Sequence, residues 1–164
     1  MLMNKEEVMS FLPHRDPFLF VDSVSEISLP ESLNGKTGPF TPAELVGGKS
    51  VCLFRVDDSV KVLEGHFPGN PILPGVVQVE MMAQAASFLA TKCLAGPIED
   101  SNIEVALISI DSARFRKPVV PNMDLEIHST LTKVRGPFQI YDCQLINNGE
   151  VMSECVVMAS LKFN

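Results

Sequence analysis

The segment from Val76 to Lys92 constrains the fold of this 164-residue chain more than any other part of it. It contains no Gly or Pro and is rich in Ala, Met, Gln, Glu and Leu, a composition that favours a helix. Its apolar residues cover nearly the whole circumference, so the sequence predicts a helix that is buried on almost every side. One narrow stripe of polar residues interrupts this surface. The stripe consists of Glu80, Gln84, Ser87 and Thr91.

Most of the chain outside this helix has the pattern of β-strands. Runs rich in β-branched and aromatic residues alternate with breaker clusters, and Asn148-Gly149 separates the last two runs as a hairpin turn. The strands are predicted at residues 18–27, 51–56, 103–110, 113–120, 125–134, 138–146 and 151–163. This order indicates an α+β fold in which an antiparallel sheet wraps around the central helix. At this length we expect a single domain, residues 1–164.

Short helices and loops connect these strands. Asn4 and Glu7 form a capping box, which predicts a short helix at the start of the chain. Residues 29–49 hold several Pro and Gly residues and are predicted to form an extended loop insertion, with one helical turn that ends at Gly47. Residues 65–75 contain three Pro and three Gly residues, so neither a helix nor a strand is expected there.

The charge balance and hydropathy exclude several classes of protein. Thirteen basic residues against twenty acidic ones give a net charge of −7, the wrong sign for binding a nucleic-acid backbone. No apolar run reaches the roughly 18 residues that a membrane-spanning helix needs. The opening MLMNKEEVMSF lacks the basic and apolar parts of a secretory signal. We therefore expect a cytoplasmic protein without membrane insertion.

The cysteines show no CxxC spacing and have apolar neighbours. They are Cys52, Cys93, Cys143 and Cys155. We expect buried thiols, and neither a disulfide framework nor a zinc site. The familiar dinucleotide, hydrolase and zinc-protease motifs are missing from the sequence. The acid-base chemistry considered below requires neither a cofactor nor a metal ion, so we expect none.

Three histidines are candidates for acid-base chemistry. His128 alternates with apolar residues in a predicted strand, which places it on a solvent-exposed face. His14 lies between two prolines, where we expect it either to cap the first helix or to bond a neighbouring loop. His66 differs, because it lies in the rigid Pro/Gly loop directly before the helix that carries Glu80.

Glu80 has two interpretations. It is either a structural carboxylate bonded to Gln84 or a loop amide, or an acid whose pKa is raised by apolar surroundings and that works with a histidine as base. A helix that starts at Gly75 and Val76 adds free N–H groups that stabilise an enolate-like oxygen. Together these groups suit removal of a proton next to a thioester carbonyl with loss of a β-hydroxyl.

Three blocks of the sequence, LPHRDPFLFVD, GHFPGNPILPGVVQVEMMAQAA and IDSARFRKPVVP, resemble the FabZ/FabA-type (3R)-hydroxyacyl-acyl carrier protein dehydratases in order and spacing. That family has the hotdog fold. The resemblance implies that His66 is the catalytic histidine and Glu80 the catalytic acid, and that the amide at Gly75 or Val76 receives the thioester carbonyl. Glu rather than Asp at position 80 resembles the FabZ branch, which dehydrates without moving the double bond.

The resemblance also implies how the site is assembled. We expect Gln84 and Phe67 to take part in substrate binding. The family implies a homodimer, in some members a trimer of dimers, in which each active site takes its histidine from one chain and its acid from the other. A non-catalytic hotdog subunit that binds an acyl carrier or a partner dehydratase remains the alternative function.

The implied partner, acyl carrier protein, is itself acidic, so we expect a basic docking surface. Arg114, Arg116 and Lys117 form the densest basic cluster of the sequence. In a strand, Arg114 and Arg116 project from the same face. The alternative is that these residues pair with acids on the same surface.

Overall fold

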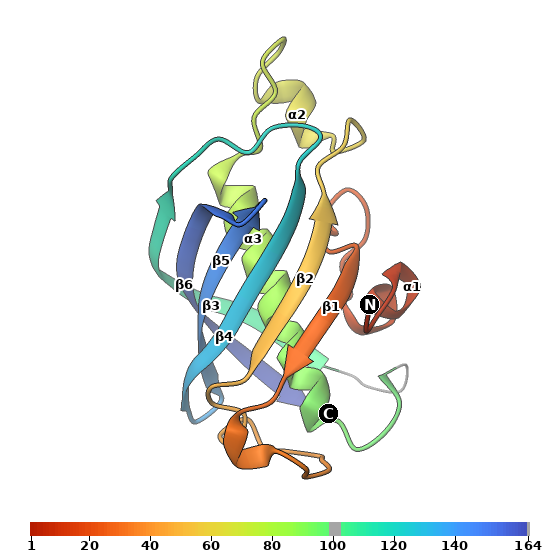
Figure 1. Ribbon diagram of the computed structural model, residues 1–164, viewed down its shortest axis with the longest axis vertical. Coiled ribbons are helices and arrows are strands. Elements are labelled where there is room, and N and C mark those ends of the chain that lie inside the picture. The colour runs from red at the N-terminus through yellow and green to blue at the C-terminus, as the bar shows by residue number, and fades with distance from the viewer. Residues whose placement is uncertain (99–102, 164) are drawn as a thin grey trace.

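The computed structural model describes residues 1–98 and 103–163. Its main element is a six-stranded antiparallel sheet in the order β1-β2-β4-β5-β6-β3, which curves around the helix α3 (Figure 1). The strands are β1 (Ser23–Ser28), β2 (Lys49–Arg55), β3 (Ile103–Phe115), β4 (Asp124–Arg135), β5 (Phe138–Asn147) and β6 (Glu150–Phe163). The helical elements are α1 (Lys5–Phe11), η1 (Glu31–Leu33), α2 (Val62–Gly65), α3 (Gly75–Ala86) and η2 (Ser87–Cys93), of which η1 and η2 are 3-10 helices. The predicted α+β class is confirmed.

The central helix is buried, as its sequence predicts. It packs against β2, β4, β5 and β6. The largest enclosed side chains of α3 and η2 are Met81, Met82, Phe88 and Leu89. Burying a side chain of this size contributes roughly 1.5–3 kcal/mol to folding. No helix among the described residues combines the length and the apolar character needed to cross a membrane.

The α-helix is shorter than its composition predicts. It ends at Ala86 and the chain winds on as the 3-10 helix η2, although the lack of Gly and Pro favours one helix up to Lys92. The hydroxyl groups of Ser87 and Thr91 each donate at 2.7 Å to the carbonyl three residues earlier. These side-chain bonds compete with the α-helical pattern, which accounts for the tighter winding.

The first strand begins later than predicted. Residues 18–22 lie outside β1, because the side-chain amide of Gln84 takes the place of a strand partner. It accepts a hydrogen bond from the amide of Phe20 and donates one to the carbonyl of Phe18, both at 2.9 Å. The prediction of a strand over residues 18–27 is therefore wrong for its first half, since β propensity does not reveal a side chain that replaces the ladder.

The strand β3 is one long strand, whereas the sequence predicts two, at residues 103–110 and 113–120. Irregularities after Leu107 and Ile110 shift its register against β6 without ending the strand. Such bulges absorb a residue that would otherwise break the pairing. The strand is also an edge of the sheet, and several of its apolar side chains are 40% to 51% exposed. They are Val105, Leu107, Ile108, Ile110 and Phe115.

The opposite edge of the sheet, β1, is covered by the start of the chain. The amides of Leu2 and Met3 donate to the carbonyl of Val24, and the amide of Val24 donates to the carbonyl of Met3. The helix α1 follows and begins with the predicted capping box between Asn4 and Glu7. These contacts protect the edge strand from pairing with another chain.

The connection between β1 and β2, residues 29–48, contains η1 and a series of turns. The side chain of Glu44 accepts hydrogen bonds from the amide and hydroxyl of Thr41. The predicted turn before Gly47 is present as consecutive turns, in which each amide bonds the carbonyl three residues earlier, and not as a regular helix. The connection contributes buried side chains to the core, namely Leu33, Phe40 and Leu45.

The prediction of buried thiols is confirmed for Cys52, Cys143 and Cys155, whereas Cys93 is half-buried. Burial raises the pKa of the Cys52 thiol. Burial and the nearby Glu44 carboxylate raise the pKa of Cys93 to about 11. Since the thiolate is the reactive form, neither group is a nucleophile at neutral pH.

Candidate active site

His66 directly follows α2, and its ring has a fixed orientation. Its Nδ1 lies 2.7 Å from the carbonyl oxygen of Ile72, and the amide of Ile72 donates to the carbonyl of His66, also at 2.7 Å. A carbonyl only accepts, so Nδ1 carries a proton and the Nε2 of the neutral ring has a free electron pair. The ring stacks on Phe67 with a centroid distance of 4.0 Å. His66 is thereby oriented as a base that acts through Nε2.

The helix α3 begins at Gly75, at the end of the Pro/Gly loop. A side chain at Gly75 would collide with Phe115, because an added Cβ would lie 2.8 Å from its ring atoms. The next residue, Val76, is 78% exposed. The first amides of a helix have no partners inside the helix, and its dipole makes this end positive. The start of α3 therefore suits a developing oxyanion.

Gln78 is a site residue that our sequence analysis does not single out. It is 3% exposed, and its side-chain amide donates to the carbonyl of Leu73 at 3.0 Å. The amide of Leu73 in turn donates to the carbonyl of Val119 at 2.8 Å. These bonds hold residues 72–75, the segment that orients His66 and starts α3. In the sequence, Gln78 is recognisable as a polar residue in the first turn of a helix that is otherwise mostly apolar, which is the one local sign of its role.

Glu80 lies in the second turn of α3 and is half-buried. The side-chain amide of Gln84, one helical turn away, donates to its Oε1 at 2.9 Å. The Nε2 of His14 lies 3.4 Å from the same oxygen. Because Gln84 is also bonded to the backbone of Phe18 and Phe20, it holds the Glu80 carboxyl in one position. The predicted bond between Glu80 and Gln84 is confirmed.

The pKa of Glu80 is lowered, so the expectation of a raised value is wrong. Burial raises this pKa, as expected, but hydrogen bonds from His14 and Gln84 and the charge of His14 lower it by more. The opposing contribution of His14 was missing from the prediction, because His14 was expected to cap α1 or to bond a loop. Instead Arg15 bonds the carbonyl oxygens of Met9 and Leu12 at the end of α1.

His128 has the position that its strand pattern predicts. It is half-buried on β4, where its Nε2 lies 2.8 Å from a carboxylate oxygen of the exposed Glu126. No hydrogen bond or ion pair joins His128 to the expected site residues in the part of the chain that the structure describes.

The expected site residues form two groups that have separate hydrogen-bond partners in the described part of one protomer. His66, Phe67, Gly75 and Val76 belong to the loop and the start of α3. Glu80 instead contacts His14 and Gln84, and among residues 1–98 and 103–163 no hydrogen bond or ion pair joins it to His66. Phe67, which stacks on His66, is 51% exposed, and Val76 at the start of α3 is 78% exposed.

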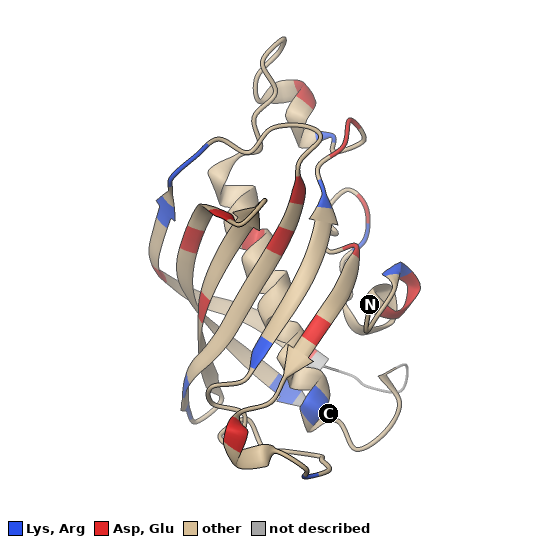
Figure 2. Ribbon diagram, in the orientation of Figure 1, with Lys and Arg blue, Asp and Glu red and all other residues tan. Residues whose placement is uncertain are grey.

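The basic cluster lies where β3 ends (Figure 2). Arg116 bonds Glu154 at 2.6 Å, and Lys117 forms an ion pair with Glu150. Arg114 lies opposite Glu154 in the register of β3 and β6. The alternative expectation, that acidic residues on the same surface pair with the basic cluster, is thus confirmed for Arg116 and Lys117. Exposed ion pairs contribute about 0–1 kcal/mol, so an incoming acidic partner replaces them at little cost.

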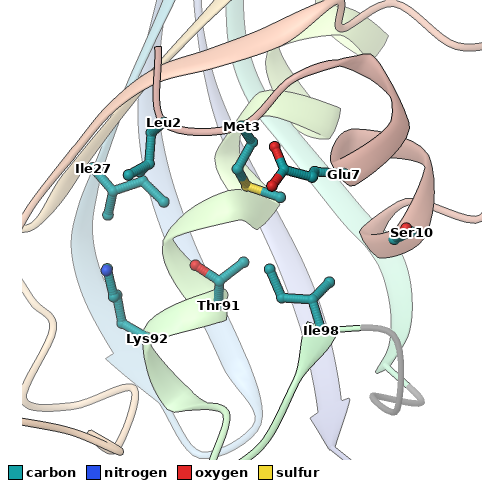
Figure 3. A pocket seen from close by; sticks show the side chains of 8 residues that line it. All are labelled: Leu2, Met3, Glu7, Ser10, Ile27, Thr91, Lys92 and Ile98. Atoms are coloured by element: carbon teal, nitrogen blue, oxygen red, sulfur yellow. The ribbon is translucent and has the colours of Figure 1, made fainter.

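A cavity of about 260 Å³ lies at the other end of the central helical segment (Figure 3). Thr91 and Lys92 of η2 and Ile27 of β1 contribute to its walls, and none of the expected site residues does. Its other lining residues are Leu2, Met3, Glu7, Ser10 and Ile98. In the part of the chain that the structure describes, no His, Cys, Asp and Glu side chains gather as a metal site.

Comparison with known proteins places these features in a family. Residues 46–154 match the family model of the ApeI-like dehydratases, described as ApeI dehydratase. The 3-hydroxyacyl-acyl-carrier-protein dehydratase FabZ of Anaeromyxobacter sp. (strain Fw109-5) is 37% identical over 161 residues, which cover 98% of this chain and 90% of the relative. The FabZ of Anaplasma phagocytophilum (strain HZ) is also 37% identical over 161 residues, 98% of this chain and 99% of the relative.

Solved structures agree on the fold. The dehydratase heterocomplex ApeI:P from Xenorhabdus doucetiae aligns with a TM-score of 0.64 and 17% identity over 94% of this chain and 90% of that chain. The fluoroacetyl-CoA thioesterase FlK aligns with a TM-score of 0.59 and 13% identity over 71% and 87%. The molecule is thus a hotdog-fold protein, as expected. The chain belongs to the FabZ-type 3-hydroxyacyl-acyl carrier protein dehydratases, which confirms the family predicted from the three sequence blocks.

Proposed function

We propose that this chain is a hydro-lyase that converts (3R)-hydroxyacyl groups on acyl carrier protein into trans-2-enoyl groups. One observation carries the proposal: Nδ1 of His66 is bonded to the Ile72 carbonyl, so Nε2 is the nitrogen left to accept a proton, in the loop that leads into α3. The amides of Gly75 and Val76 would stabilise the thioester oxygen while Nε2 removes the proton from C2. Every step is a proton transfer or a C–O cleavage, so the reaction needs no cofactor.

We further propose that the active form is a homodimer paired through β3. The outer side of this strand is an unpaired edge with exposed apolar side chains, and a second copy would extend the sheet and cover them. Among the described residues of one protomer, no hydrogen bond or ion pair joins His66 to Glu80, which supports a site that takes the histidine from one chain and the carboxyl from its partner. Trimers of such dimers would leave this pairing unchanged.

For the carrier protein we propose the cluster at the end of β3, Arg114, Arg116 and Lys117, as the docking surface. Phe115 lies within this cluster, and its ring is in contact distance of Gly75. A carrier bound to these basic residues would therefore deliver its acyl thioester next to the start of α3. Gln84 would act on the substrate only through Glu80, since its own amide is engaged by the backbone.

The test uses purified protein with 3-hydroxyacyl carriers of graded chain length and detects the loss of water by mass spectrometry. His66→Ala and Glu80→Ala should each lower kcat by about 10²–10⁴-fold while the protein still folds, as for general acid-base groups. A residual rate within about threefold of wild type in either variant would contradict the assigned roles.

Mixing the two variants tests the shared site. After subunit exchange, a mixed dimer has one site with both His66 and Glu80 intact, so part of the activity should return. The unmixed variants, treated in the same way, are the control. No recovery despite verified exchange would mean that each site is built within one chain.

A second candidate is a non-catalytic hotdog subunit that binds an acyl carrier or a partner dehydratase. The observation in its favour is that the similar structure from Xenorhabdus doucetiae is a dehydratase heterocomplex. This candidate predicts that the wild-type chain alone releases no water from any carrier, yet still binds carriers in a pull-down.

A further inference from the structure

His14 lies against the carboxyl group of the candidate site. Its Nε2 is 3.4 Å from Oε1 of Glu80, and its ring stacks near Phe18 with a centroid distance of 6.4 Å. Nδ1, on the other side of the ring, is buried and has no hydrogen-bond partner among the described residues. The polar contact of the His14 ring in this part of the chain is therefore with Glu80.

The contact between His14 and Glu80 matters for which group carries the proton that the release of water needs. Loss of a hydroxyl group as water requires a proton, and an ionised carboxylate has none to give. Burial raises the pKa of Glu80, but His14 and Gln84 lower it by more, so Glu80 is ionised at rest. In the described structure, the titratable side chain in contact with the Glu80 carboxylate is His14.

We propose that His14 holds this proton at rest and passes it to Glu80 when substrate binds, so that the two residues act as one acid. The inference rests on the proposed dehydratase function. A bound acyl chain and the partner subunit exclude water from the carboxylate, which makes its ionised form less favourable. The proton then moves from Nε2 of His14 to the carboxyl group of Glu80. His14 acts through Glu80 and is a positioning residue.

The protons balance over one turnover. His66 of the partner subunit takes the C2 proton, and the electrons of that C–H bond form the C2–C3 double bond. The C3–O bond breaks, and the hydroxyl oxygen takes the proton of Glu80 and leaves as water. After product release His66 loses its proton to solvent, His14 regains one from solvent, and Glu80 is again ionised.

The surroundings of His14 keep the proton transferable. A protonated imidazole donates from both nitrogens, and a buried Nδ1–H of His14 would have no acceptor in the described structure. The ionised Glu80 carboxylate offsets this cost at rest, and desolvation of that carboxylate removes the offset, which favours transfer of the proton to Glu80. The charged neighbours in its own loop are engaged elsewhere: Arg15 bonds the Leu12 carbonyl at 2.7 Å, and Asp16 lies 3.8 Å from Lys61.

The first experiment tests the pair without catalysis. Carbon-13 NMR of labelled glutamate carboxyl groups, assigned with Glu80→Gln, follows the titration of Glu80 in wild type, His14→Gln and His14→Phe. Gln keeps an N–H donor without a titratable proton, and Phe keeps only a ring. We expect the titration midpoint of Glu80 to rise in the order wild type, His14→Gln, His14→Phe. The same midpoint in all three proteins would overturn the inference.

The second experiment measures kinetics with a carrier-linked substrate. His14→Gln should lower kcat by about 10-fold or more with little change in KM, because the lost proton store acts on chemistry rather than on binding. The alkaline limb of its kcat profile should move to lower pH, since a carboxyl alone then has to hold the proton. The matched control is His128→Gln, which removes the histidine of the exposed His128–Glu126 pair and should leave both readouts unchanged.

A wild-type kcat and pH profile in His14→Gln would overturn the inference. The inference would also be overturned if kcat falls only in proportion to thermal stability while the pH profile stays the same, because a merely structural role of His14 gives that result. If His14→Phe does not fold, His14→Gln decides. If the wild-type chain dehydrates no carrier-linked substrate, the proposed function fails. The coupling of His14 to Glu80 is tested separately, by the order of the Glu80 titration midpoints in the three proteins.

Discussion

The two edges of the sheet differ in how they meet solvent. At β1, backbone bonds from the N-terminal arm occupy the edge, and Met3 of that arm is only 6% exposed. At β3, a strand of 13 residues has apolar side chains that are 40% to 51% exposed, and no described segment pairs with its outer side. A long apolar edge invites pairing with another chain unless it is covered. The chain thus protects one edge and leaves open the edge whose Phe115 adjoins the candidate site.

The largest effect is expected when charge is placed on the open edge. Ile108 and Ile110 are each 49% exposed on β3. The double variant Ile108→Asp, Ile110→Asp would bury two carboxylates in the proposed dimer contact, so we expect monomers and the loss of most activity. Light scattering and a carrier-linked assay measure the two outcomes.

Val46→Asp is the matched control, because Val46 is 38% exposed in the connection between β1 and β2. The same kind of change there should leave assembly and activity intact. An active monomer of the β3 double variant would show that the open edge has no role in assembling the site.

A smaller effect, limited to one substrate class, is expected at the end of the open edge. Arg114→Glu combined with Arg116→Glu should raise KM for carrier-linked substrate steeply, and added salt should reduce the difference from wild type. Turnover of a small N-acetylcysteamine thioester should stay almost unchanged, because that substrate needs no docking surface. Equal losses with both substrates would place the role of these residues in the fold instead.

The smallest effect on activity is expected at the protected edge. Met3→Ala removes a buried side chain over β1 and should lower the free energy of unfolding by about 2–5 kcal/mol, with kcat and oligomeric state unchanged. Urea denaturation measures the change. Leu2→Ala is the control, since Leu2 is 49% exposed. A dimer that dissociates in Met3→Ala would mean that the two edges do not have separate roles.

Local patterns predict much of this fold. The buried helix follows from the apolar circumference of residues 76–86, and the hairpin between β5 and β6 follows from Asn148-Gly149. The continuity of β3 cannot be predicted in this way, because a bulge inside a strand has no composition that distinguishes it from a break between two strands. The catalytic roles of His66 and Glu80 depend on the family blocks and stay predictions.

Contacts between distant segments account for what the sequence does not reveal. The bonds of Gln84 join it to residues 64 and 66 positions earlier, and they turn the expected first half of β1 into a loop. The contact between His14 and Glu80 arises from the same loop, and it reverses the expected direction of the Glu80 pKa shift. Neither segment carries a local signal of its distant partner, because tertiary packing alone brings them together.

The close approach of Phe115 to Gly75 has a consequence for regulation. The ring lies next to the first residue of α3, so a displacement of the edge strand would also move the surroundings of the amides proposed to receive the thioester oxygen. Pairing at β3 would then do more than add a second subunit: it would set the geometry of those amides. Activity would depend on the cellular concentration of the chain, because dilution below the dimer dissociation constant would switch the site off without any inhibitor.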